Sequence, residues 1–186
     1  MSRVVIVLLS AVLTGTVWAS ASGRIVGPDG APIGGAEVCE FLPESPERCV
    51  TADTRGVYRM ENTLRPSLLV RASGFLSKSI DAVPLSTPVR LERAASLRVI
   101  IVDADTAKPL ASGRVMLDSP SGRRIGDFVP FNAAGVRIST LEPGDVFVRV
   151  EADGYRPSGP VPTNLVSGVE RALTIRLKKQ AAPTSH

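Results

Sequence analysis

Apolar and polar residues alternate along most of this chain with a period of two, which is the pattern of half-buried β-strands. Every second residue from Val146 to Ala152 is apolar, while Arg149 and Glu151 lie between them. Leu68, Val70 and Ala72 form the same kind of face earlier in the chain. A helical periodicity is absent after the N-terminal segment, and turn residues recur roughly every 8–12 positions, as in an all-β sandwich.

The pattern predicts two series of seven strands. In the first series the strands fall near residues 22–27, 36–42, 48–52, 56–61, 67–73, 76–82 and 88–93. In the second series they fall near residues 96–102, 113–118, 123–130, 135–140, 145–151, 159–163 and 170–178. The fold class is therefore expected to be all-β, with two tandem seven-stranded Greek-key β-sandwich domains.

The two series are copies of one unit. Pro32 and Pro109 occupy matching positions with an offset of 109 − 32 = 77, and Gly56 and Gly135 match with an offset of 135 − 56 = 79. An offset that drifts so little indicates a duplication in which the insertions lie in turns. We expect one domain over 22–93, a second over 96–179 and a disordered tail over 180–186.

The N-terminal segment has the layout of a secretory signal peptide over 1–21. Arg3 is followed by an apolar stretch from Val4 to Val17, and small residues then offer cleavage after Ala21 or after Ala19. An uncleaved anchor is the alternative, although the apolar stretch is shorter than the roughly 20 residues that span a bilayer. We therefore expect a periplasmic or extracellular protein that is not inserted in a membrane after cleavage.

Export changes how the two cysteines are interpreted. Cys39 and Cys49 are the only cysteines of the chain, and a polar, proline-containing stretch separates them, as in a hairpin loop. An even cysteine count in an oxidising compartment favours a disulfide, for which we expect a Cα–Cα distance of about 4.4–6.8 Å. A zinc or redox role would require more ligands or a Cys-x-x-Cys spacing, so no metal or cofactor is expected.

Charge and titratable residues give little indication of catalysis. The formal net charge is +4 and the arginines are scattered among acids, unlike the basic clusters of nucleic-acid-binding proteins. The only histidine is His186, at the C-terminus, so histidine-dependent hydrolysis is not expected. Asp53 and Asp103 are interpreted as turn residues that accept backbone hydrogen bonds, although Asp103 with Asp105 could be half of a calcium loop.

The turn and core positions resemble the carboxypeptidase regulatory-like family, a transthyretin-like (prealbumin-type) seven-stranded sandwich found as repeats in secreted bacterial proteins. The matching elements of the first copy are Gly23–Gly27, Pro32–Val38, Thr51–Tyr58, Val70–Phe75 and Val89–Leu91. The second copy matches at Val102, Asp103, Thr106, Pro109–Leu110, Gly135–Val136, Leu141–Gly144 and Val150–Tyr155. It departs from the first copy in having Ser112-Gly113 in place of Gly35-Ala36 and Asn132 in place of Asp53, and it has Arg137 where the family usually has an aromatic residue. The resemblance implies the fold and carries no activity.

Aromatic residues bear on possible ligands. Trp18 lies in the signal segment, and Tyr58, Phe75, Phe147 and Tyr155 occupy strand or corner positions typical of packing. Phe128 and Phe131 flank a proline near a turn and could form an exposed patch for a partner, or could pack into the second core.

The expected function is therefore that of a non-catalytic binding or scaffolding protein whose partner is an envelope protein or a polysaccharide. A carbohydrate-binding module and a small exported hydrolase are the alternatives.

Overall fold

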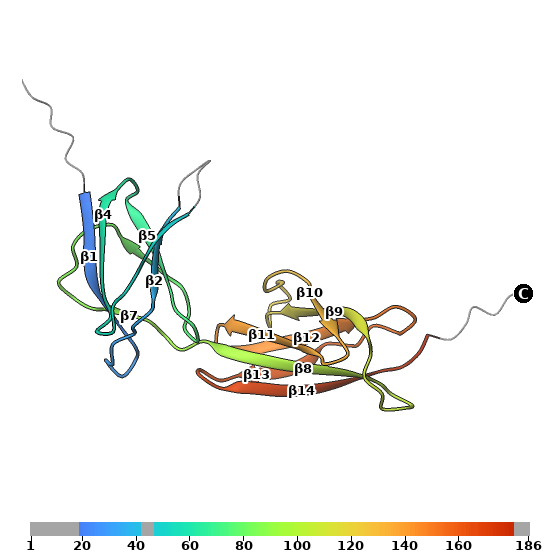
Figure 1. Ribbon diagram of the computed structural model, residues 1–186. Helices are drawn as coiled ribbons and strands as arrows, with labels where there is room; N and C mark the ends of the chain where they lie inside the picture. Colours follow the sequence, from blue (N-terminus) through green and yellow to red (C-terminus); the bar gives the residue numbers. More distant parts are fainter. Residues whose placement is uncertain (1–18, 42–46, 181–186) are drawn as a thin grey trace, which may run out of the picture.

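The computed structural model describes residues 19–41 and 47–180, which form fourteen β-strands (Figure 1). The described residues contain no helix, and so none that could cross a membrane. Most of the predicted signal peptide and all but the first residue of the predicted tail lie outside them. The all-β class predicted from the alternating pattern is confirmed.

The first seven strands make two sheets. Their bounds are β1 Ala19–Val26, β2 Glu37–Glu40, β3 Arg48–Thr51, β4 Val57–Thr63, β5 Ser67–Arg71, β6 Lys78–Asp81 and β7 Val89–Arg90. One sheet has the order β4-β1-β7 and the other has the order β3-β2-β5-β6. Strand β7 pairs in parallel with β1, whereas the other pairs are antiparallel.

The last seven strands repeat this topology. Their bounds are β8 Ala95–Asp103, β9 Ser112–Asp118, β10 Val129–Asn132, β11 Val136–Leu141, β12 Gly144–Glu151, β13 Val161–Leu165 and β14 Glu170–Leu177. Their sheets have the orders β11-β8-β14 and β10-β9-β12-β13, which are those of the first half with seven added to each label. The duplication inferred from the sequence offsets therefore appears as two sandwiches of the same topology.

Each half has its own hydrophobic core. The first cluster of buried side chains contains Ile25, Tyr58 and Leu68, and all its members lie before the start of β8. The second cluster contains Leu97, Val148 and Ile175, and all its members lie from Ala95 onward. Both sheets of each half contribute to its cluster, so each sandwich encloses its apolar side chains between its own two sheets.

The two copies share a glycine that the fold requires. Gly56 and Gly135 have positive φ angles of 74° and 84°. A Cβ atom would lie 2.3 Å from the carbonyl oxygen of Ile25 at Gly56 and 2.3 Å from that of Val99 at Gly135. Only glycine fits both the left-handed turn and the close approach to the strand that pairs with the following one, β1 in the first copy and β8 in the second, which explains why this position recurs in the repeat.

One predicted strand is misplaced. The alternating pattern predicts a strand over 123–130, but β10 begins only at Val129. Gly122 and Gly126 have φ angles of 80° and 71°, and the Ser119 hydroxyl accepts a hydrogen bond from the Arg123 amide. These contacts fold the segment after β9 into a tight turn, which cannot extend as a strand.

The junction between the halves is held from both sides. The Ala94 amide donates to the Gly74 carbonyl, and the Ala94 carbonyl accepts from the Gly168 amide. The Arg93 guanidinium lies 5.6 Å from the centre of the Phe75 ring. The short link predicted between the repeats therefore contacts loops of both sandwiches.

Candidate functional site

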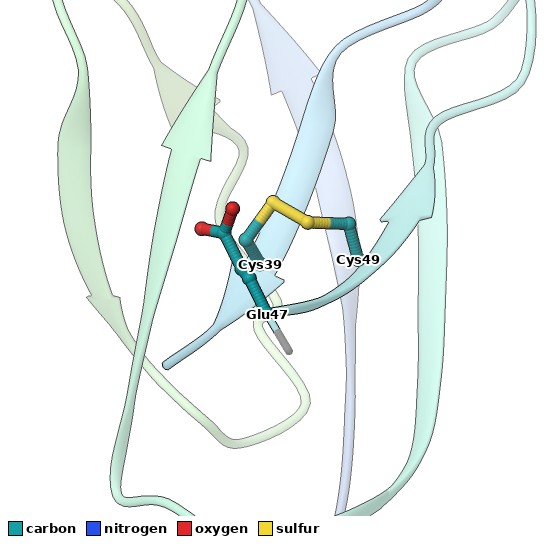
Figure 2. Close-up of side chains that lie close together, drawn as sticks. All are labelled: Cys39, Glu47 and Cys49. Atoms are coloured by element: carbon teal, nitrogen blue, oxygen red, sulfur yellow. A yellow bond between two sulfur atoms is a disulfide. The ribbon is translucent and has the colours of Figure 1, made fainter. Parts of the chain in front are cut away.

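The two cysteines form a disulfide between adjacent strands. Cys39 of β2 lies directly opposite Cys49 of β3, and their sulfur atoms are bonded (Figure 2). The Cα atoms are 4.0 Å apart, so the expected range of 4.4–6.8 Å was wrong. The expectation covered disulfides in general, whereas facing residues on paired antiparallel strands can approach to about 4.5 Å, and the pairing of β2 with β3 holds these two Cα atoms below the usual range.

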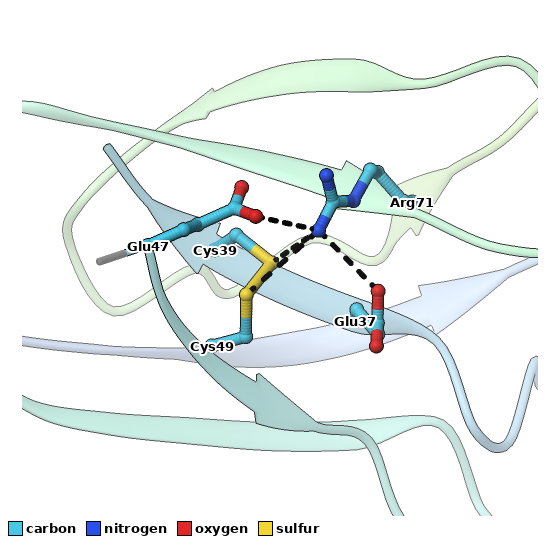
Figure 3. Close-up of a disulfide and its surroundings, with 5 residues drawn as sticks. All are labelled: Glu37, Cys39, Glu47, Cys49 and Arg71. Carbon is cyan, nitrogen blue, oxygen red and sulfur yellow. Dashed lines mark hydrogen bonds and ion pairs between the residues drawn. A yellow bond between two sulfur atoms is a disulfide. The ribbon is translucent and has the colours of Figure 1, made fainter.

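An arginine covers this disulfide. The Arg71 Nη2 atom lies 3.2 Å from Cys39 Sγ and 3.9 Å from Cys49 Sγ (Figure 3). The same nitrogen donates to Glu47 at 2.9 Å and to Glu37 at 3.4 Å. The guanidinium is thus shared between two carboxylates and the bonded sulfurs on the outer face of the sheet.

The cluster does not suit a metal ion while the disulfide is intact. Cys39, Glu47 and Cys49 place one potential ligand atom each within 4.8 Å of one another. Metal-binding cysteines act as thiolates, and sulfurs joined in a disulfide cannot supply them. The Arg71 guanidinium is a positive charge beside the same atoms and would oppose a cation. This arrangement is that of a structural cross-strand link.

Phe131 does not belong to an exposed patch. The side chain is only 6% exposed and is part of the second core. A Cβ atom on Gly113 would lie 2.5 Å from the Phe131 ring, so a glycine is needed opposite this phenylalanine. In the first copy the corresponding space is shared by two small buried residues, Ala36 and Ala52. The sequence does not show that the large Phe131 and the missing side chain of Gly113 fill one space together, so Phe131 could equally have been a surface residue.

Phe128 does lie at the surface. Its side chain is 43% exposed, and the guanidinium carbons of Arg114 and Arg124 lie 4.6 and 4.3 Å from the ring centre. Arg114 is paired with Glu151 of β12 at 2.6 Å, and Arg124 lies 4.0 Å from the Asp118 carboxylate. We call Arg114, Arg124 and Phe128 the arginine–phenylalanine patch. It combines an apolar ring with two cations, a composition suited to contact with an acidic partner.

The patch and the disulfide cluster occupy matching places in the two copies. The β9–β10 register, continued by one residue from the pair Val129 and Val115, puts Phe128 opposite Met116, as Cys49 lies opposite Cys39.

The ion pair beside each of them is reversed between the copies. Glu37 faces Arg71 across β2 and β5, whereas Arg114 faces Glu151 across β9 and β12. Each outer face therefore has a cross-strand ion pair, which lies beside the Cys39–Cys49 disulfide in the first copy and beside the facing residues Met116 and Phe128 in the second.

The acids singled out in the sequence serve turns, as predicted. Hydrogen bonds to Asp53, chiefly from the Val57 amide, lower the pKa of that carboxyl group. The amide of Thr106 and the hydroxyl of Tyr155 donate to Asp103 and lower its pKa to about 2. The same Asp103 contact raises the pKa of Tyr155. Asp103 thus ties the turn after β8 to the corner after β12.

Sequence reasoning missed a buried acid in the first sandwich. Glu40 is completely buried, accepts from the amides of Leu64 and Arg65, and pairs with Arg48 at 2.7 Å. Arg48 also donates to the Asn62 carbonyl. Glu40 therefore holds the β4–β5 loop against the end of β2. The opposite charges of Glu40 and Arg48 across the predicted hairpin were the available signal.

Comparisons with known proteins give similarity in architecture only. No protein-family model and no curated protein matches the chain. Among solved structures, the chain is similar to the minor pilin GBS52 of Streptococcus agalactiae, with 17% identity over 90% of this chain and 99% of that one and a TM-score of 0.44. It is also similar to the shaft pilin SpaA of Lactobacillus rhamnosus GG, with 9% identity, 88% and 99% coverage and a TM-score of 0.48.

A third similar structure is the Bacillus anthracis TIE protein, with 15% identity over 87% of this chain and a TM-score of 0.44. This chain spans about a third (34%) of that protein's length. Similarities at these levels transfer no activity or partner to this chain, which has an all-β fold of tandem sandwiches.

Proposed function

We propose that this chain is an exported, non-catalytic binding or scaffolding protein built from two carboxypeptidase regulatory-like domains. The observation that carries the proposal is the arginine–phenylalanine patch. There a half-exposed aromatic ring lies against two guanidinium groups on a rigid sheet. We propose that the patch contacts a carboxylate-bearing surface of an envelope protein or an acidic polysaccharide, because cations and an apolar ring together complement such a surface.

The titratable groups support a non-catalytic role. The carboxylates with displaced pKa values, Asp53 and Asp103, accept hydrogen bonds from neighbouring backbone amides within their turns. General acid–base catalysis requires groups that converge on a substrate with pKa values near the working pH. A pKa of about 2 leaves Asp103 ionised and a weak base at neutral pH.

The test compares two exposed phenylalanines. Phe128 is 43% exposed in the patch, and Phe41 is 58% exposed in the first sandwich, away from it. We expect Phe128→Ala to abolish crosslinking of the chain to its partner in the native envelope fraction, and Phe41→Ala to retain it. Retention of the same crosslinked product by Phe128→Ala would show that the patch is not the binding site.

A carbohydrate-binding module is the second candidate, since an exposed aromatic ring can also stack on a sugar. Pull-down with a neutral insoluble polysaccharide, followed by a wash with concentrated salt, distinguishes the two candidates. Binding that survives the wash supports stacking on a sugar, whereas a complex with an acidic partner is held by charges and is released by salt. A hydrolase is the third candidate. It would be supported by an activity that disappears in Asp103→Asn while the melting temperature stays unchanged.

We also propose that the chain is exported through a cleaved signal peptide. The burial of Ala21 supports cleavage after Ala19. Ala21 is completely buried, and its backbone lies opposite Met60 in the pairing of β1 with β4. Cleavage after Ala21 would remove this core residue, whereas cleavage after Ala19 would keep it. We expect Ser20 as the mature N-terminus, which N-terminal sequencing of the exported protein would test.

A further inference from the structure

Among the residues that the structure describes, strand β14 has a long open sheet edge, which ends where the Arg156 amide donates to the Lys178 carbonyl just beyond the strand. It is the last strand in the order β11-β8-β14 and pairs only with β8. Its range, Glu170–Leu177, covers eight residues, whereas its counterpart in the first sandwich, β7, covers two. Unpaired backbone groups along such an edge are a template for adding another strand.

The direction of the backbone groups can be read from the pairing with β8. The Val169 carbonyl accepts from the Ser96 amide, and the Leu177 carbonyl accepts from the Ala104 amide. Odd-numbered residues of β14 therefore direct their backbone groups toward β8. The amides and carbonyls of Glu170, Ala172, Thr174 and Arg176 point to the open side, because successive residues of a strand alternate in direction.

The side chains of these four residues would complement those of the same strand in a second copy of the chain. In an antiparallel pair of two β14 strands centred on Leu173, Glu170 faces Arg176 of the second copy and Ala172 faces Thr174. This register is the one in which all four open residues find hydrogen-bonding partners. It also places an acid opposite a base at both ends and small side chains in the middle.

The charges on this edge are available for such pairing. Oε2 of Glu170 is bonded to Arg137 within the chain at 2.5 Å, which leaves Oε1 for a second cation. Arg176 is exposed and has no ion pair among the residues that the structure describes. We propose that two copies of this chain associate through antiparallel pairing of their β14 strands.

A groove beside the same edge fits this arrangement. It has a volume of about 590 Å³ and lies between Arg156–Val161 and Thr174–Lys178. Pro157, Pro160 and Ile175 are among its lining residues. The proposed register brings Val169 of the second copy opposite Leu177, at this groove. Val169 is 50% exposed in the single chain, and the pairing would cover its apolar side chain.

The occupant is a second copy because the edge carries both members of each ion pair. The homotypic register satisfies every open backbone group and both charges at once, as expected of an isologous interface. An extended segment of another protein is the competing occupant. It would leave this chain monomeric when purified alone.

The experiment measures self-association of the full chain, in the form that cells export, by analytical ultracentrifugation. We expect a monomer–dimer equilibrium. Arg176→Glu makes the edge acidic throughout, and Glu170→Arg makes it basic throughout, so each variant alone should associate at least about tenfold more weakly. A mixture of the two should associate again, because each acidic residue then faces a basic one.

Two further variants separate pairing from folding. Thr174→Pro removes an amide that points to the open edge and leaves the ladder to β8 intact, so it should abolish the dimer while the chain remains folded. Arg65→Glu makes the same charge change as Arg176→Glu on an exposed residue of the first sandwich and should leave association unchanged. A chain that stays monomeric up to about 1 mM would overturn the proposal. A dimer unaffected by Thr174→Pro, or a variant mixture that fails to associate, would also overturn it.

Discussion

Removal of the Cys39–Cys49 disulfide should destabilise the first sandwich and leave the second unchanged. The bond joins β2 to β3, and both cysteines lie in the first half of the duplicated fold. The two hydrophobic clusters share no residue. A Cys39→Ala/Cys49→Ala variant should therefore unfold in two steps, with only the first step moved.

The expected size follows from the loop that the bond closes. The sequence separation is 10 residues. The chain-entropy account gives a loss of about 9 cal/mol/K of unfolded-state entropy for such a loop, which is about 2.7 kcal/mol at 25 °C. For a domain of this size each kcal/mol corresponds to roughly 4–8 °C, so the melting temperature of the first sandwich should fall by roughly 10–20 °C. Loss of the sulfurs beneath Arg71 adds to this change.

Differential scanning calorimetry of the exported chain and the variant measures both steps in one molecule. The second sandwich serves as the internal control, because it has Met116 and Phe128 where the first has the cysteines. A single transition that moves as a whole would contradict the two-core interpretation. Unchanged melting in the variant would contradict the stabilising role of the bond, and two alkylated thiols in unreduced protein would contradict its existence. Fragments 20–93 and 95–179, which keep the buried Ala21 and Ala95, should each unfold cooperatively.

Three other changes test the buried and turn residues. Glu40→Gln should destabilise the first sandwich by about 1–3 kcal/mol in urea unfolding, because Arg48 and two backbone amides lose their carboxylate; equal stability would contradict that role. The pKa of Asp103 is lowered in the folded state, so its stabilising effect is present above the ordinary value of 3.8 and is lost as pH falls toward about 2. Asp103→Asn should therefore remove acid sensitivity of the second sandwich between about pH 4 and 2, measured by circular dichroism at each pH, whereas an unchanged acid profile would contradict this. Gly135→Ala should cost more than Gly154→Ala, which should cost about 1–2 kcal/mol. Both glycines have positive φ, but only Gly135 also approaches a backbone carbonyl. Equal losses in thermal unfolding would contradict the close-approach argument.

The sequence alone determined the duplication and all the strands except β10. Alternation of apolar residues marks the inward face of β5 and β12, where Leu68, Val70, Val148 and Val150 are buried. This succeeds because the side chains of a strand point to opposite faces in turn, so burial on one face leaves a period of two. The turn formed by Asp53 and Gly56 was also readable, because its hydrogen bonds and the positive φ of Gly56 involve residues close in the chain.

Only the tertiary structure decided which side chains of sequence-distant strands lie next to one another. The burial of Phe131 depends on the missing side chain at Gly113, which lies on a neighbouring strand. The position of Arg71 over the disulfide and the open edge of β14 likewise depend on sheet order, which a local pattern does not contain. Local periodicity specifies how a strand is oriented, whereas its neighbours are selected by packing across the whole sandwich.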